Sequence, residues 1–300
     1  MRILDPTIGL ITHAAFSPDG AYLTASGQRG IVLATWPAVV EGRSPFAVIP
    51  AEDKVNQVAW HPDGQRFAAA NGPVIQVWDT RQRLRRTLIE LPGQQGPMLA
   101  VSFSPDGYRL AFGGGWWDER GCALIVPVDT WRPPHRIDTH ANEVGTVLFT
   151  RPDVLLTGSA DRTVAIHPLR DGEEQPPPIP LRSPVQALAL RTGDGQLAVA
   201  AGNTVLLWRV AASGRPVPED AFICRGHKGA ARAVAFSPDG RAAASVGDDG
   251  TLRFWDPDTG AARSSLDVGI GGLRAVAFAP DGLTVVAGGD EGRLAVVDVE

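Results

Sequence analysis

The sequence has few of the residues that build a disulfide framework or a cationic surface. Its 300 residues include two cysteines, two methionines and two tyrosines, and its only lysines are Lys54 and Lys228. Cys122 and Cys224 lie far apart in the chain, so we expect two small buried side chains and no disulfide. A net charge of −5 offers no electrostatic footprint for a nucleic acid or an anionic membrane.

Long apolar stretches are also missing. No uninterrupted run approaches the ~20 apolar residues that a membrane-spanning helix needs, and the first six residues, broken at Pro6, are too short for a signal peptide. The 34 glycines and 25 prolines are spread along the chain as turn residues, which argues against a low-complexity segment. We therefore expect a soluble cytoplasmic protein that binds no membrane and no nucleic acid.

One stretch shows how the chain is organised. Residues 233–236 and 242–246 are largely apolar, strand-compatible runs, and residues 251–255 alternate in part between polar and apolar side chains. The first two are joined by Ser-Pro-Asp-Gly, in which proline presets φ and glycine supplies positive φ. The last two are joined by Gly-Asp-Asp-Gly, a hairpin signal. The pattern predicts three antiparallel strands.

The same pattern recurs along the whole chain. The turn after the first strand lies at residues 17–20, 61–64, 104–107, 151–154, 192–195, 237–240 and 279–282, in steps of 41 to 47 residues. An aromatic residue or leucine lies four or five positions before the last residue of each turn. Seven units with this step fit the ~40–45 residues of a four-stranded propeller blade.

Short motifs within these units resemble those of WD repeats. The Trp-Asp pair stands at Trp78-Asp79 and Trp255-Asp256, and Gly-His stands at Gly226-His227. The resemblance covers essentially the whole chain. It implies an all-β fold: one domain over residues 1–300, a seven-bladed β-propeller of four-stranded antiparallel sheets.

The resemblance also implies a buried hydrogen-bond network with a structural role. In the family this network joins a histidine, a serine or threonine of the second strand, a hairpin aspartate and the tryptophan. In the sixth unit these residues are His227, Ser245, Asp249 and Trp255. In the fourth unit they are His140, Thr157 and Asp161, with His167 in place of the tryptophan.

The last unit is one strand short. Residues 294–298 align with the third strand of the sixth unit, so a fourth strand has to come from elsewhere. Counting back from the first-strand aromatic to the outer-strand position places Leu4 there. We therefore predict that Arg2 to Leu4 complete the seventh blade and close the ring, which removes an unpaired edge.

No catalytic or metal-binding motif stands out. The sequence has no phosphate-binding loop, no His-Glu-x-x-His and no Cys-x-x-Cys. His13, in the first strand of the first unit, has no second histidine or cysteine near it in sequence. The acids at 248–249 and 290–291 are interpreted as hairpin residues. We predict no metal, no cofactor and no enzymatic activity.

Two features suggest a surface for a partner. An insertion at residues 113–121 contains Trp116 and Trp117, which either anchor a partner or cap the third blade. The residue four before each first-strand aromatic samples the face where these strands begin. These residues are Thr12, Asn56, Leu99, Gly145, Gln186, Arg232 and Arg274, joined two positions further out by Lys54 and Glu143.

The cations of this face offer two interpretations. Lys54, Arg232 and Arg274 outnumber the acids there, which suits a carboxylate-bearing peptide; a solvated rim is the alternative. Pro177 to Arg182 matches Pro-x-x-Pro-x-Arg, which indicates either a protected strand edge or a polyproline recognition segment.

The resemblance implies a monomeric, non-catalytic scaffold or adaptor that binds a protein or peptide on the narrow face. We name Lys54, Asn56, Trp116, Trp117, Arg232 and Arg274 as the candidate partner-binding residues. Two alternatives stay open: an enzyme or small-ligand binder that uses the central channel, and a regulatory module of a separately encoded kinase or protease.

Overall fold

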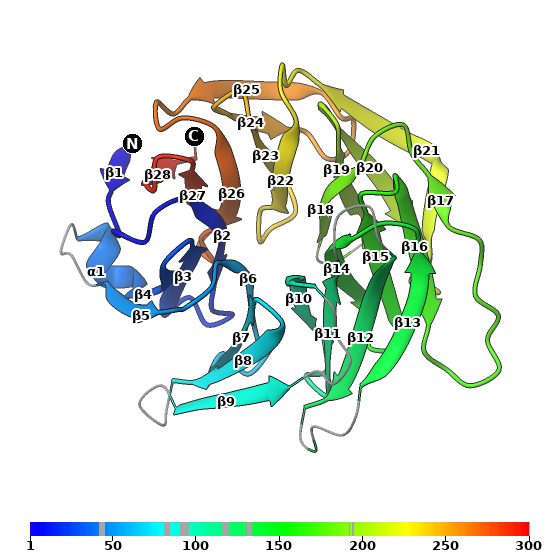
Figure 1. Cartoon of the computed structure of the whole chain (residues 1–300). Coiled ribbons are helices and arrows are strands. Elements are labelled where there is room, and N and C mark those ends of the chain that lie inside the picture. The colour runs from blue at the N-terminus through cyan, green and yellow to red at the C-terminus, as the bar shows by residue number, and fades with distance from the viewer. Residues whose placement is uncertain are drawn as a thin grey trace.

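The computed structural model describes residues 1–41, 46–80, 85–90 (backbone only), 96–115, 120–128, 130, 134–191, 193 and 195–299. In this part of the chain, seven four-stranded antiparallel sheets stand around a central channel (Figure 1). The predicted all-β, seven-bladed propeller is confirmed.

Each blade runs from an inner strand at the channel to an outer strand at the periphery. Blade 1 holds β2 (Ile11–Phe16), β3 (Tyr22–Gly27), β4 (Gly30–Thr35) and β5 (Ala47–Pro50); blade 2 holds β6 (Val55–Trp60), β7 (Arg66–Asn71), β8 (Val74–Asp79) and β9 (Arg85–Glu90); blade 3 holds β10 (Met98–Phe103), β11 (Arg109–Gly114), β12 (Gly121–Pro127) and β13 (His135–His140); blade 4 holds β14 (Val144–Arg151), β15 (Val154–Ser159), β16 (Thr163–Pro168) and β17 (Ile179–Pro180).

The remaining three blades follow the same order. Blade 5 holds β18 (Val185–Leu190), β19 (Leu197–Ala201), β20 (Thr204–Val210) and β21 (Pro216–Arg225); blade 6 holds β22 (Ala231–Phe236), β23 (Ala243–Gly247), β24 (Thr251–Trp255) and β25 (Ala262–Asp267); blade 7 holds β26 (Leu273–Phe278), β27 (Thr284–Gly289), β28 (Leu294–Asp298) and β1 (Arg2–Leu4).

The turn that marks each unit is built locally. In blade 1 the Ser17 hydroxyl donates to Asp19 Oδ1 at 2.6 Å, and the same carboxylate accepts from the amide of Ala21 at 3.1 Å. Gly20 has a φ of 72°, which an L side chain rarely adopts. Side chains of the turn itself therefore hold its shape, independently of the rest of the ring.

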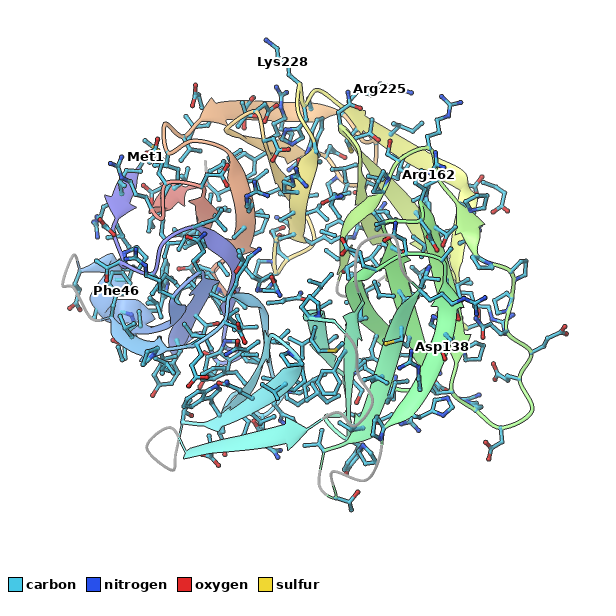
Figure 2. All side chains as sticks on the ribbon, in the orientation of Figure 1. Met1, Phe46, Asp138, Arg162, Arg225 and Lys228 are labelled. Atoms are coloured by element: carbon cyan, nitrogen blue, oxygen red, sulfur yellow. The ribbon has the colours of Figure 1, made fainter. Side chains whose placement is uncertain are left out.

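The hydrophobic core lies between blades. Among the described residues, the buried apolar side chains form seven clusters, and each cluster draws on two neighbouring blades. In one of them Ile11 and Leu23 of blade 1 pack with Val286 and Leu294 of blade 7. Figure 2 shows side chains filling the space from one sheet to the next. Each blade thus depends on both of its neighbours for burial.

The two ends of the described chain meet in blade 7. Strand β1 pairs antiparallel with β28, with Arg2 opposite Val296 and Leu4 opposite Leu294. The predicted closure by residues 2–4 is confirmed. The Arg2 guanidinium also donates to the carbonyl of Val39 at 3.0 Å, which ties this strand to blade 1.

Two local elements differ from the plain repeat. A short helix, α1 (Trp36–Val40), begins at the third-strand tryptophan of blade 1, because Pro37 cannot donate to a strand ladder but fits the first turn of a helix. In blade 4, prolines reduce the outer strand to β17, which is two residues long.

Candidate functional site

All seven inner strands share one irregularity, close to the point where each begins. The pairing of the inner strand with the second strand shifts by one residue there, which is a β-bulge. The residue left out of the pairing is Thr12, Asn56, Leu99, Gly145, Gln186, Arg232 or Arg274, according to the blade. A bulge re-aims a side chain, and here it produces a ring of seven equivalent positions.

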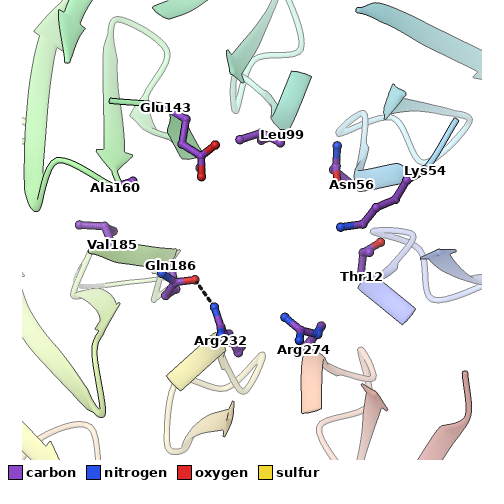
Figure 3. Close-up of a pocket in the computed structure, with 11 residues that line it drawn as sticks. Thr12, Lys54, Asn56, Leu99, Glu143, Ala160, Val185, Gln186, Arg232 and Arg274 are labelled. Atoms are coloured by element: carbon purple, nitrogen blue, oxygen red, sulfur yellow. Dashed lines mark hydrogen bonds between the residues drawn. The ribbon is translucent and has the colours of Figure 1, made fainter. Parts of the chain in front are cut away.

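These positions converge on one cavity at the mouth of the channel. The cavity has a volume of about 240 Å³, and all seven bulge residues line it together with Lys54, Glu143, Ala160 and Val185. In Figure 3 Lys54, Glu143 and Arg274 extend into a common space from different blades. We call this cavity the channel mouth.

Hydrogen bonds between blades fix part of the wall of the channel mouth. The Thr12 hydroxyl donates to the carbonyl of Val55 at 2.6 Å, and Asn56 Nδ2 donates to the carbonyl of Met98 at 2.9 Å. Each bond runs from one bulge residue to the inner strand of the next blade. The polar side chains here therefore act as fixed walls.

The two arginines of the mouth are paired, which corrects the expectation of cations with few opposing acids. Arg232 makes a two-pronged contact with Asp248, at 2.7 and 2.6 Å, and its Nη1 donates to Gln186 Oε1 at 2.9 Å. Arg274 Nε donates to Asp290 Oδ1 at 2.5 Å. The acids come from the hairpin between the second and third strands of the same blade, which lies on the same face.

Lys54 and Glu143 are the charges of the channel mouth that lack such a partner. Neither side chain forms a hydrogen bond or ion pair with any other described residue. Burial, with a smaller contribution from the nearby Arg274 charge, lowers the pKa of Lys54. Burial raises the pKa of Glu143. Both shifts show groups that have lost solvation without gaining a counter-charge.

One histidine directly follows a bulge residue of the channel mouth, Thr12. His13 Nε2 is 3.4 Å from Gln57 Nε2, and within the described chain His13 Nδ1 has no hydrogen-bond partner. Burial lowers the pKa of His13 to about 4, so it is neutral at pH 7. No group of three or more His, Cys, Asp or Glu side chains that could hold a metal ion occurs in the described ranges.

The network residues of blade 6 are in contact. Trp255 Nε1 donates to Ser245 Oγ at 2.8 Å, the Ser245 hydroxyl donates to His227 Nε2 at 2.8 Å, and His227 Nδ1 donates to Asp249 at 3.0 Å. Hydrogen bonds hold the pKa of Asp249 at about 2 despite its partial burial. These groups lie between strands, away from the channel mouth.

Blade 4 contains an equivalent series of hydrogen bonds, in which a histidine takes the place of the tryptophan. His140 Nδ1 donates to Asp161 at 2.9 Å, and its Nε2 lies 2.6 Å from Thr157 Oγ1. His167 Nε2 lies 2.8 Å from the same hydroxyl, in the place that the indole N–H takes in blade 6. Burial lowers the pKa of His167 to about 4, which keeps the ring neutral.

Some of the candidate residues cannot be placed in this way. Trp116 and Trp117 lie outside the described residues, so their proposed role stays a prediction.

The sequence analysis did not connect Asp248 and Asp290 with the arginines of the channel mouth. The signal was available, because each acid stands sixteen residues after its arginine, at the hairpin of the same blade.

Comparisons with known proteins agree with this architecture. The family model described as "WD domain, G-beta repeat" matches residues 43–79 and 219–256. "Cell division cycle 20.5, cofactor of APC complex" from Arabidopsis thaliana is 25% identical over 225 residues, which cover 68% of this chain and 46% of that protein. The "Guanine nucleotide-binding protein subunit beta" of Zea mays is 26% identical over 251 residues, 73% of this chain and 63% of that protein.

A third relative, "Actin-interacting protein 1" from Drosophila melanogaster, is 27% identical over 214 residues, 67% of this chain and 33% of that protein. In each case the matched stretch is less than two thirds of the relative's own length. No helix in the described part of the chain is long and apolar enough to cross a membrane.

A closed ring of seven four-stranded sheets with its bulge residues around a channel defines a β-propeller protein. In addition, two of its repeats match the WD-repeat family model, and the chain is similar to the three relatives named above.

Proposed function

We propose that this protein is a non-catalytic scaffold that binds a protein or peptide partner at the channel mouth. The observation that carries the proposal is the convergence of seven bulge residues, with Lys54 and Glu143, on one polar cavity. Two of the relatives support it, because one is named as a cofactor of the APC complex and the other as an actin-interacting protein. A monomeric state and a cytoplasmic location stay predictions.

The chemistry of the described residues supports binding over catalysis. An acid–base or nucleophilic mechanism needs convergent groups within hydrogen-bond reach of a common reacting atom. At the channel mouth the arginines are engaged by Asp248 and Asp290, and Lys54 and Glu143 form no ion pair with each other. In the part of the chain that the structure describes, His13 has no carboxylate or hydroxyl partner that would activate it.

A variant that plugs the channel mouth tests the proposal. Gly145 lines the cavity, and a Cβ built on it meets only the carbonyl of Val185, at 3.7 Å. Gly145→Trp therefore fills the mouth without strain in the backbone, and Gly145→Ala is the matched control. We expect affinity capture from a cell extract, read by mass spectrometry, to lose its specific partners with Gly145→Trp only.

The melting temperature of both variants shows whether the fold persists. Full retention of every partner by a folded Gly145→Trp protein would contradict binding at the channel mouth. In the same assay the double variant Trp116→Ala, Trp117→Ala separates the two interpretations of that loop. Loss of a partner at an unchanged melting temperature supports an anchor, whereas a lower melting temperature with intact capture supports a cap of blade 3.

A further inference from the structure

The two charges without a counter-charge lie on opposite sides of the channel mouth. Lys54 precedes β6 in blade 2, and Glu143 precedes β14 in blade 4. Both extend into the cavity, and Figure 3 shows Lys54 next to Thr12 and Asn56, with Arg274 further along the rim and Glu143 across the opening. The mouth is therefore divided into a cationic side and an anionic side.

The cationic side has unused hydrogen-bond donors. Lys54 Nζ carries three N–H groups with no acceptor among the described residues. Arg274 binds Asp290 through Nε, while its Nη1 and Nη2 groups contact no described acceptor. The Arg274 guanidinium repels the Lys54 ammonium and, after burial, contributes to the lowered pKa of Lys54. A carboxylate bound between the two groups relieves this repulsion through charge-assisted hydrogen bonds.

The anionic side is a single carboxylate on a backbone that hydrogen bonds hold in place. The amide of Glu143 donates to Asn142 Oδ1 at 2.8 Å, and the carbonyl of Glu143 accepts from the amide of Ala160 at 3.1 Å. Glu143 is half-buried and meets no described cation. A ligand that covers it without supplying a positive group would complete the desolvation of a charge at a large cost.

The size of the cavity indicates what enters it. Its volume of about 240 Å³ lies below the ~300–1,000 Å³ of typical small-molecule pockets, yet it is large enough for side chains from a loop. Leu99, Ala160 and Val185 provide short apolar wall between the two charged sides. These dimensions fit the tips of two neighbouring side chains better than a whole ligand.

We propose that the channel mouth recognises a loop of a protein partner in which an acidic side chain stands close to a basic one. The acid binds between Lys54 and Arg274, and the base pairs with Glu143. This inference rests on the proposed function and adds the chemistry of the partner. Complementary charge of both signs also suppresses wrong partners. A loop with one charge alone leaves a charge of the mouth desolvated and unpaired, and a loop with the two charges reversed meets repulsion.

Selection from a random peptide library displayed on phage tests this inference with the full chain as bait. We expect peptides that bind the wild type, and that fail to bind Gly145→Trp, to pair an acidic residue with a nearby basic one. For one such peptide, labelled with fluorescein, Lys54→Gln and Glu143→Gln are each expected to weaken binding at least tenfold by anisotropy.

Lys228→Gln is the matched control, because Lys228 is the only other lysine and extends from the periphery of the ring (Figure 2). Replacing the acid of the peptide by glutamine should weaken binding to the wild type, with little further effect on Lys54→Gln. Lys54→Arg should retain most of the affinity. Such coupling identifies direct pairing rather than a general loss of charge.

The two lysines also allow a direct spectroscopic readout. Reductive ¹³C-methylation labels Lys54, Lys228 and the N-terminal amine and keeps their charge. We expect addition of the peptide to shift the Lys54 methyl signal and to raise the Lys54 pKa, with Lys228 as the internal reference.

Two results overturn the inference. Peptides that bind at the mouth but contain no acid–base pair would refute the proposed charge pattern. Wild-type affinity in Lys54→Gln would refute it too, and both results would leave the proposed function intact. Peptides that bind wild type and Gly145→Trp equally would contradict the channel mouth as the binding site, and with it both proposals.

Discussion

At the channel mouth, one neighbouring side chain decides whether a cation is neutralised by an ion pair. Arg232 and Arg274 have Asp248 and Asp290 within reach, so they serve as fixed donors with offset charge. Lys54 has no such neighbour among the described residues and keeps its charge available. Whether a cation of the channel mouth is neutralised thus depends on a single acid of the adjacent hairpin.

The neutral His13 gives a prediction about pH. Burial lowers its folded-state pKa to about 4, against an ordinary value of 6.5, so below pH 6.5 the unfolded chain takes up a proton that the folded chain does not. Stability is therefore present above pH 6.5 and falls as the pH drops towards 4. At pH 5 the loss from this residue is about 2 kcal/mol.

We expect His13→Gln to reduce the difference in unfolding free energy between pH 7.5 and pH 5 by that amount, measured by urea denaturation. His135→Gln, an exposed site on β13, is the control and should behave as the wild type. An unchanged pH dependence in His13→Gln would show that His13 is not buried as a neutral group.

At the scale of single elements, the bulges and the prolines shape the blades. The bulge near the start of each inner strand turns one side chain per blade towards the channel mouth. In blade 4, β17 pairs with Thr163 and Val164 alone, so Ala165 to Pro168 have no partner on the outer side within the described sheet. The neighbouring prolines, which lack N–H groups, prevent another strand from adding here.

Replacing Pro176, Pro177 and Pro178 by Ser, Thr and Thr therefore restores backbone donors next to an incomplete edge. We expect concentration-dependent association by size-exclusion chromatography with light scattering, and a change in unfolding free energy of less than about 1 kcal/mol. The control variant Ala212→Ser with Ser213→Thr, in an exposed turn, should elute as the wild type. A triple variant that elutes as the wild type at every concentration would reject edge protection.

For the whole molecule, stability depends on closing the ring. Every blade buries its apolar residues against two neighbours, so an opening between blades 7 and 1 exposes one cluster and frees the edge of β28. The inner strands contact their neighbours in an unbroken circle from β2 through β26 and back to β2.

Deleting residues 1–5 removes β1 and should lower the unfolding free energy by about 2–4 kcal/mol, from lost strand hydrogen bonds and the packing of Leu4. For a chain of this size we expect a fall in Tm of roughly 5 °C by calorimetry, with increased association. Ile3→Ser keeps the backbone pairing and should cost less than about 1 kcal/mol. An unchanged Tm in the deletion would show that β1 does not hold the ring closed.

The sequence alone determined the number of blades, the position of their turns and the strand that closes the ring. Each of these depends on local interactions that repeat from unit to unit. Ser17 and Asp19 hold their own turn, and Leu4 occupies the outer-strand position that the spacing in the other units defines. The regular spacing of the units also identified the residues that line the channel mouth, because equivalent positions of the inner strands lie around one channel.

Tertiary structure decided what those residues are able to do. Whether Arg232 or Lys54 carries an open charge depends on contacts between strands and hairpins, which the sixteen-residue spacing of Arg232 and Asp248 allows but does not by itself establish. The start of α1 at Trp36 and the two-residue length of β17 were also visible only in the structure, although prolines in the sequence cause both. Charge and solvation depend on distances of a few ångströms, and only the packed ring sets these.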